Sequence, residues 1–349
     1  MQATTEAEGT VQDTPAASPR RWPFWLALIA AVALAAVDLA WTYWQLGGDR
    51  ATQYWSDLIA VPVPAATAVC CWIAARRREG RSRRAWILLG LAAMSWAIGE
   101  AVWSYYELAR NVDVPFPGFA DIGFLGLIPF AVAGLLTLPP VPRSFTAQGR
   151  TLLDGLIITG SIFFVGWRTV IGPTYHEGAG TTLEKVVGLA YPIGDVVLLS
   201  MALFIALRVA RRHRGALLLI GLGLAVLAAA DSGFIYQNLH DTYASGSLID
   251  PLWEIGFLVM MLGAVIAIPQ RELTEGERAP GFFSFALPYA CVVAVVVMAA
   301  IWRRNEPLEA PLFWTMLVVL LLVVVRQLLT ILDNFVLTRT LESRVRELV

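Results

Sequence analysis

The sequence is poor in charge, in lysine and in cysteine. Only 15% of its 349 residues are charged and 57% are hydrophobic, whereas a soluble domain is about a quarter charged. Lys185 is the single lysine among 26 basic residues, and the net charge is −1. This shortage of charge excludes an ordinary soluble domain and indicates a polytopic membrane protein. The arginines stand in short clusters between apolar runs, so no nucleic-acid partner is predicted.

Patterns typical of catalytic and metal sites are also missing. No HExxH or CxxC motif occurs. The segment GLGLAVLAAADSG has no preceding strand and no following GK[ST], so it is not a phosphate loop. The lone lysine stands at a helix end rather than at mid-membrane, which argues against retinal. The three cysteines lie within apolar runs and predict no disulfide: Cys70, Cys71 and Cys291. We therefore expect no enzyme site, cofactor or metal within these residues.

Apolar windows long enough to cross a bilayer, about 20 residues each, occur ten times. They predict an all-α, polytopic membrane bundle of about ten transmembrane helices, preceded by a polar, disordered tail at residues 1–20. The bundle is expected over residues 21–302, with the tenth transmembrane helix in 303–332. The ten windows are Trp22–Leu46, Tyr54–Ala75, Ala85–Leu108, Asp121–Leu138, Thr151–Ile171, Val186–Val209, Ala216–Leu239, Ile249–Ile268, Phe282–Trp302 and Pro311–Leu332.

Basic residues are unevenly distributed between the connecting segments. If the N-terminus is cytoplasmic, the inner segments hold 19 basic residues and the outer segments hold 6. The positive-inside rule favours this orientation. We therefore expect a multi-pass protein of the bacterial inner membrane, with both termini in the cytoplasm and the lipid bilayer as its first partner.

Carboxylates recur near the predicted outer ends of successive helices. Asp121 and Glu254 each open an apolar helix, in the similar segments ADIGF and WEIGF. The preceding helices carry an acid about eight residues before their outer end, as at Glu100 and Asp231. This spacing predicts a two-helix hairpin that is used four times and is followed by a different pair of helices. The predicted hairpins are 22–75, 85–138, 151–209 and 216–269, and the different pair begins with helix 282–302.

These acids suggest a polar pocket that opens outward. Ionisable residues in a bilayer cost free energy, and they normally face the bundle interior or a wet cavity. We predict that some rings and carboxylates form a cage for an unidentified cationic or amphipathic small ligand. The candidate pocket residues are Asp38, Asp57, Glu100, Asp121, Arg168, Asp195, Asp231, Glu254, Trp41, Trp103, Tyr236 and Trp253.

Two structural alternatives stay open for the same residues. The rings are also typical of an interfacial aromatic belt. The acids could be satisfied internally, for example Asp195 by Arg168. For Asp121 the helix dipole offers a milder explanation, because a carboxylate near a helix N-terminus gains about 0.3–1 kcal/mol.

The last predicted helix runs beyond the membrane boundary without Pro or Gly and becomes amphipathic. Its apolar residues follow coiled-coil steps with one break of five: Leu329, Leu332, Val336, Leu341, Val345 and Leu348. We expect a cytoplasmic signalling helix over residues 333–349, a homodimer formed through it, and an output domain beyond Val349.

Several stretches resemble the multi-span N-terminal sensor region of bacterial, actinobacterial-type GGDEF/EAL cyclic-di-GMP signalling proteins, or of related sensor histidine kinases. They are FPGFADIGFLGLIPFAVAGLLTLP, LLDGLIITGSIFFVGW, LAYPIGDVVLLSMAL and RQLLTILDNFVLTRTLESRVREL. The resemblance covers most of the chain from about residue 85. It implies a signal-input module for a diguanylate cyclase or phosphodiesterase. No GGDEF, EAL or kinase motif occurs before Val349, so it implies no catalysis in these residues.

Two other functional classes use the same carboxylates differently. A small-molecule or cation transporter would use them to couple transport to an ion gradient. Many transporters have inverted repeats, however, whereas each copy of a two-helix repeat begins in the same membrane orientation. A structural membrane scaffold would need them only for stability.

Overall fold

The protein is a helical bundle. The computed structural model describes residues 22–137, 145–177, 181–208, 211–240, 242–268, 282–304 and 307–348, and every regular element within them is helical. The all-α prediction is therefore confirmed for this part of the chain, and the predicted N-terminal tail lies outside it. In chain order the elements are α1 (Trp22–Trp44), α2 (Asp49–Ala60), α3 (Pro62–Arg76), α4 (Gly80–Ser104), the π-helical turn η1 (Tyr105–Arg110), α5 (Phe119–Leu136), α6 (Phe145–Gly166), the π-helical turn η2 (Trp167–Ile171), α7 (Gly172–Glu177), α8 (Thr182–Arg208), α9 (Arg211–Leu239), α10 (Asp250–Ala267), α11 (Phe282–Trp302) and α12 (Ala310–Leu348).

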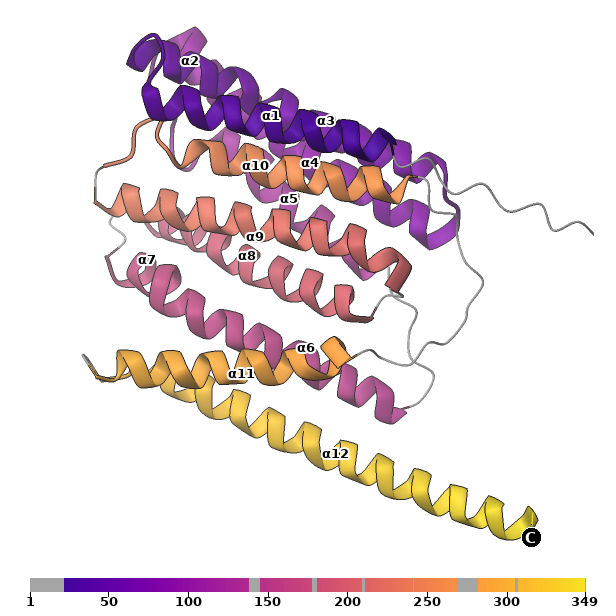
Figure 1. The fold of residues 1–349 in the computed structure, drawn as a ribbon. Coiled ribbons are helices and arrows are strands. Elements are labelled where there is room, and N and C mark those ends of the chain that lie inside the picture. Colours follow the sequence, from indigo (N-terminus) through magenta and orange to yellow (C-terminus); the bar gives the residue numbers. More distant parts are fainter. Residues whose placement is uncertain are drawn as a thin grey trace, which may run out of the picture.

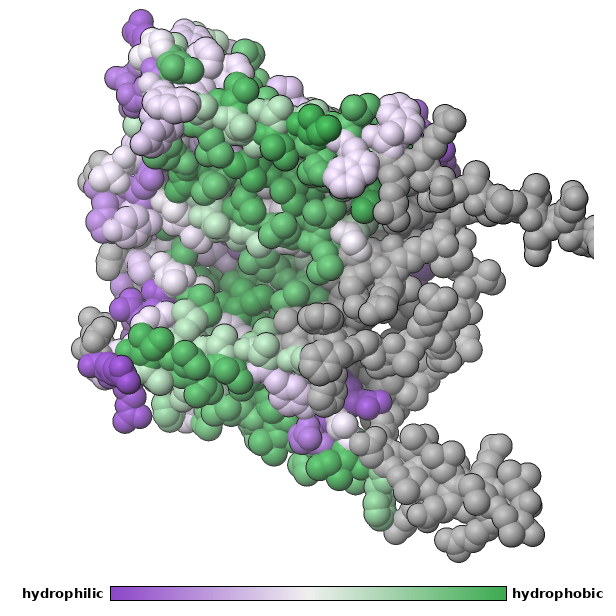
Figure 2. Space-filling view, viewed as in Figure 1, coloured by the Kyte–Doolittle hydropathy of each residue, from purple (hydrophilic) through white to green (hydrophobic). Residues whose placement is uncertain are grey.

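The helices have the length and composition of membrane spans. Across the described segments, nine helices are long and apolar enough to cross a membrane, and α11 adds a shorter apolar stretch, Pro288–Trp302. The long helices lie side by side, and α1 begins on the side of the bundle where α12 ends (Figure 1). A broad apolar band covers the surface next to a polar rim at the left-hand end (Figure 2). These features indicate a membrane-embedded protein.

The second predicted span, Tyr54–Ala75, is divided between two helices. α2 ends at Ala60 and α3 begins at Pro62, with Val61 between them. Val61 keeps helical backbone angles, but Pro62 has no N–H with which to continue the helical hydrogen bonds, and proline fits the first turn of a new helix. The division therefore follows from the Val-Pro sequence, and α2 and α3 together still make one apolar stretch long enough to span.

Six helices form a closed ring. In order around it, α3 packs against α4, α4 against α5, α5 against α8, α8 against α9, α9 against α10, and α10 against α3. We call these elements the six-helix ring. Its large core is rich in alanine and contains Leu89, Leu135 and Phe257, each at most 1% exposed. α1 lies outside the ring and packs against α10.

Glycines bring the backbones together in two hairpins of the ring. A Cβ at Gly123 of α5 would lie 2.4 Å from the backbone nitrogen of Gly99 in α4. In α9 and α10, a Cβ at Gly223 would lie 2.5 Å from the carbonyl oxygen of Gly256. Small residues at such crossings let membrane helices approach closely. Gly123 and Gly256 each stand two residues after the acid that begins the predicted motif, Asp121 and Glu254.

The remaining long helices form a lateral layer, which we define as α6, α11 and α12. α6 packs against α8 of the six-helix ring, whereas α11 and α12 pack against α6. This layer has its own small core, in which Phe164, Val295 and Leu312 are almost fully buried. Figure 1 shows α12 at the lower edge of the molecule, beyond α6 and α11.

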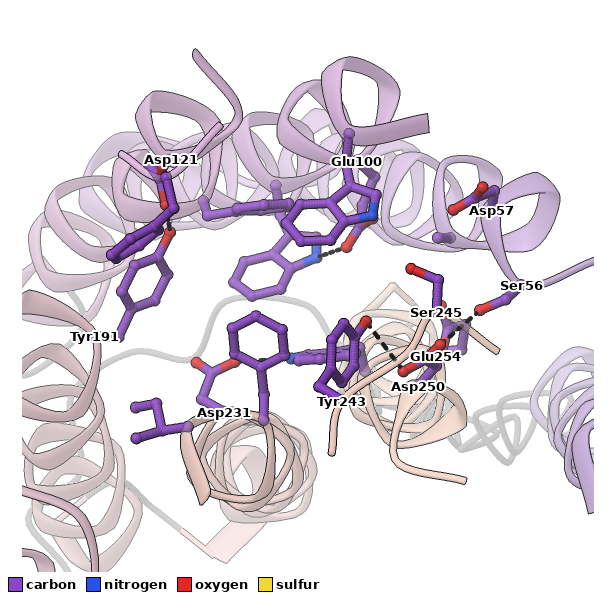
Figure 3. A pocket seen from close by; sticks show the side chains of 18 of the residues that line it. Ser56, Asp57, Glu100, Asp121, Tyr191, Asp231, Tyr243, Ser245, Asp250 and Glu254 are labelled. Atoms are coloured by element: carbon purple, nitrogen blue, oxygen red, sulfur yellow. Dashed lines mark hydrogen bonds between the residues drawn. The ribbon is translucent and has the colours of Figure 1, made fainter. Parts of the chain in front are cut away.

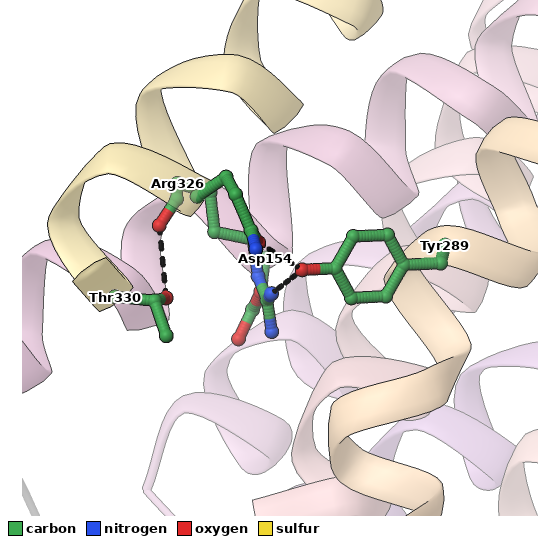
Figure 4. Close-up of polar contacts among 5 residues, drawn as sticks. Asp154, Tyr289, Arg326 and Thr330 are labelled. Carbon is green, nitrogen blue, oxygen red and sulfur yellow. Dashed lines mark hydrogen bonds and ion pairs between the residues drawn. The ribbon is translucent and has the colours of Figure 1, made fainter. Parts of the chain in front are cut away.

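One ion pair joins the lateral layer. Arg326 of α12 donates from Nε to Oδ1 of Asp154 in α6, and from a terminal nitrogen to Oη of Tyr289 in α11 at 2.7 Å (Figure 4). The guanidinium also lies 4.9 Å from the centre of the Tyr289 ring. Arg326 is 5% exposed, so its charge is neutralised within the protein.

α12 is one uninterrupted helix of 39 residues, with no boundary at residue 332. Leu329 lies near α6, where its Cδ1 is 3.6 Å from a Cβ built at Gly149, and Leu332 is 59% exposed. The other residues predicted for the signalling helix are within α12, but their side chains lie outside the described part: Val336, Leu341, Val345 and Leu348. The coiled coil and the homodimer stay predictions.

Candidate functional site: a carboxylate-lined cavity

A cavity of about 120 Å³ lies inside the six-helix ring, at the end where residues 111–118 and 242–249 connect the helices. Figure 3 shows acidic and aromatic side chains around it. Its walls come from α2, α4, α5, α8, α9 and α10. The acids that line it are Asp57, Glu100, Asp121, Asp231, Asp250 and Glu254.

Two of these acids accept a hydrogen bond from a tryptophan indole. Trp96 donates from Nε1 to Oε1 of Glu100 at 2.9 Å. The indole nitrogen of Trp253 donates to Oδ1 of Asp231 at 2.8 Å. These bonds leave one oxygen of each carboxylate for other partners, and they place an aromatic ring beside each acid.

Asp121 has two roles at the start of α5. Its Oδ2 accepts from the backbone N–H of Gly118 at 2.6 Å, which caps the helix, and its Oδ1 accepts from Oη of Tyr191 in α8 at 2.5 Å. Asp121 stands in the first turn of α5, where the helix dipole favours a carboxylate. Asp121 also ties α5 to α8 at the rim of the cavity.

Asp250 is the most fully satisfied acid of the site. Its Oδ2 accepts from the backbone N–H of Gly246 at 2.6 Å and from Oγ of Ser56 at 3.3 Å. Its Oδ1 accepts from Ser247 at 3.2 Å and from Tyr243 at 3.4 Å. Asp250 thus fixes the loop before α10 and joins α10 to α2.

Two cavity acids keep an oxygen without a hydrogen-bond donor among the described residues. They are Asp57 through Oδ2 and Glu254 through Oε2, and the two residues are 6% and 5% exposed. A buried carboxylate oxygen without a donor is unfavourable. The nearest acids to Asp57 are Glu107 and Asp250.

The cavity brings together seven of the twelve predicted pocket residues. Trp103 and Trp253 line it with five of the acids, namely Asp57, Glu100, Asp121, Asp231 and Glu254. Asp195 lines a second, smaller cavity of about 20 Å³, which shares Trp96, Tyr191 and Asp231 with the first. The acids predicted from the sequence pattern thus come from five different helices and meet at one cavity.

The other four predicted residues do not line either cavity. Asp38 is buried against α2, where its Oδ1 accepts from the indole of Trp55 at 3.0 Å, and the Trp55 ring stacks on Trp41 at 4.7 Å. Tyr236 is 61% exposed and lies 4.3 Å from the ring of His240. Arg168 belongs to η2.

Several cavity residues were not singled out from the sequence. Asp250 is the clearest omission. It could have been predicted as a helix-start residue, because an acid followed by proline at the start of an apolar run is typical of a helix N-terminus. The phenol of Tyr243 lies in a connecting loop, and burial raises its pKa well above the usual value. Glu107 does not line the cavity, but it accepts from Ser245, which does, at 2.6 Å and from Gln53 at 3.1 Å. These contacts are tertiary and have no signature in the local sequence.

The carboxylates are distributed around the cavity rather than gathered at one point. Within the described segments, no group of three or more His, Cys, Asp or Glu side chains is placed to hold a metal ion. The arrangement is therefore suited to a distributed, charged recognition surface. No family model, curated protein or solved structure matches this chain.

Proposed function

We propose that this chain is a membrane-embedded signal-input module that relays an extracytoplasmic or membrane signal to a cytoplasmic output domain. The output domain is a diguanylate cyclase or phosphodiesterase, as the sequence resemblance implies. The observation that carries the proposal is the combination of a buried acidic cavity at one end of the ring with a helix, α12, that leaves the bundle at the other.

The contacts between helices supply a route for the signal. Gly188 and Tyr191 of α8 line the cavity, α8 packs against α6, and α6 packs against α12. A change in the cavity that moves α8 would thus reach α12 through one intervening helix. Packed helices tend to shift between discrete arrangements, so occupancy would favour one of two positions of α12.

The length of α12 supports an output on the cytoplasmic side. Its membrane-compatible part is Ala310–Leu332, and residues 333–348 continue the helix. Sixteen residues at 1.5 Å each extend it by about 24 Å. This extension is long enough to carry a change of register out of the bilayer.

Cysteine cross-linking along α12 in membranes tests the relay. Single cysteines would be placed from Leu329 to Leu348 in a background without the three native cysteines. We expect dimer cross-links with helical periodicity, and a changed periodicity in Asp57→Asn but not in Asp38→Asn. A flat or absent cross-linking profile would contradict the proposal.

The transporter is the second candidate, and the intramembrane carboxylates without a basic neighbour in the cavity lining favour it. Uptake into proteoliposomes that depends on an ion gradient and is lost in Glu100→Gln would establish transport. Absence of such uptake, together with a periodic cross-linking profile, would favour the signal-input module.

A further inference from the structure

Acidic residues line the cavity without basic residues beside them. Six of its lining residues are carboxylic acids, and none of the described residues that line it is Lys, Arg or His. In the lateral layer, by contrast, the buried acid Asp154 has Arg326 as its partner. Among the described residues that line the cavity, the acids thus have no basic partner, and a cationic ligand would supply one.

Two carboxylate oxygens without a described hydrogen-bond donor indicate where a cationic group would bind in the cavity. Oδ2 of Asp57 in α2 and Oε2 of Glu254 in α10 are both buried. Figure 3 shows both residues at the same end of the cavity, away from the Asp121–Tyr191 pair. Each oxygen can accept an N–H from a charged donor, and such charge-assisted hydrogen bonds are about twice as strong as neutral ones.

Aromatic rings form much of the cavity wall. Trp96 lies 4.7 Å from Phe124, and Phe234 lies 4.6 Å from Tyr243 and 5.8 Å from Trp253, as ring centroids. Faces of such rings attract organic cations, most strongly where water is excluded. The rings also provide the apolar contact that a hydrocarbon body needs.

Size and geometry select the kind of cation. The cavity of about 120 Å³ is close to the 150 Å³ or so that admits benzene in an engineered protein core. A metal ion is disfavoured because the acids of the described segments are not clustered around one point. A compact organic amine fits both the volume and the spread of the acids.

We propose that the cavity binds a small primary organic amine, whose ammonium group donates to Asp57 and Glu254 and whose apolar body lies among the aromatic rings. This inference deepens the proposed function by naming the chemical class of the signal, and it rests on the same cavity. Binding can be measured on this chain alone, without an output domain.

The test is calorimetric titration of the chain in lipid nanodiscs at pH 7. The probes are n-butylamine, its neutral analogue 1-butanol, and sodium chloride. We expect the amine to bind with one site per chain and the alcohol to bind at least tenfold more weakly. No binding of the amine at millimolar concentration, equal binding of the alcohol, or a response to sodium alone would overturn the proposal.

Matched variants locate the site. Asp57→Asn and Glu254→Gln are each expected to weaken amine binding at least tenfold, whereas Glu254→Asp should keep more of it than Glu254→Gln does. Asp38→Asn is the control, because Asp38 also has a buried oxygen without a donor but lies outside the cavity lining. Equal loss in Asp38→Asn and Asp57→Asn would overturn the assignment. If the amine binds but leaves the cysteine cross-linking profile of α12 unchanged, the proposed relay is refuted and the amine site is not.

Discussion

The six-helix ring and the lateral layer both bury carboxylates, but they satisfy them differently. In the lateral layer, Asp154 has an arginine partner from another helix. In the ring, acids such as Glu100 and Asp231 accept only neutral indole donors, and Glu254 keeps an oxygen without any described donor. The ion pair of the lateral layer is explained as a structural contact between helices. The ring instead surrounds a cavity with acids that have no basic partner among the residues lining it, which is the arrangement expected where a cationic ligand binds.

The largest effect should come from breaking the pair in the lateral layer. Arg326→Leu leaves the carboxylate of Asp154 buried without its cation, and such a loss typically costs about 3–5 kcal/mol. The free energy of unfolding, measured by denaturant titration in mixed micelles, should fall by this amount. The double variant Asp154→Leu/Arg326→Leu should recover most of the loss, because it removes both charges. A double variant as unstable as Arg326→Leu would show that the ion pair is not the cause.

The next effect compares helix packing in the two regions. Gly123→Ala places a methyl group 2.4 Å from the backbone nitrogen of Gly99 in the ring, and overpacking of this kind costs about 1–3 kcal/mol. In the lateral layer, the nearest atom to a Cβ at Gly149 is Leu329 Cδ1 at 3.6 Å, so Gly149→Ala is the matched control. The same titration should show a loss only for Gly123→Ala. Equal stabilities would mean that α4 and α5 separate without cost.

The smallest effect concerns the loop that covers the ring cavity. Tyr243 donates to Asp250 over a long distance of 3.4 Å, so Tyr243→Phe should cost about 0.5 kcal/mol or less at pH 7. Burial raises the pKa of this phenol, so the folded protein keeps the proton at a pH where the unfolded chain, with a pKa of about 10, loses it. The stability that Tyr243 contributes is thus present below about pH 10 and falls as the pH rises above it. Between pH 9 and 11, the unfolding midpoint of Tyr243→Phe should fall less than that of the unmodified protein. Equal falls in the two proteins would contradict this explanation.

Much of the architecture could be predicted from the sequence, because hydrophobic length alone identifies membrane helices. The nine helices that can span a membrane all overlap predicted windows, and the acids near helix ends led to five of the six carboxylates of the cavity. The division of the second span at Val61 also had a visible cause in Pro62.

The neighbours of each acid could not be predicted in the same way. Asp38 shares the spacing of Glu100 and Asp231, yet α1 packs outside the ring, so its carboxylate contacts Trp55 instead of the cavity. The pairing of Asp154 with Arg326 joins residues 172 positions apart. Which helices close the ring is a tertiary property, and one sequence contains no direct signal for it.

The most direct test of the difference between the two regions is a paired stability measurement of Glu254→Gln and Asp154→Asn at pH 7. No Lys, Arg or His lines the cavity beside Glu254 among the described residues, so Glu254→Gln breaks no ion pair, and its unfolding free energy should stay equal to that of the unmodified protein or rise. Neutralising Asp154 leaves Arg326 without its counter-charge, so stability should fall clearly. If Glu254→Gln instead loses as much stability as Asp154→Asn, the ring acids are structural and the account of a ligand cavity is contradicted.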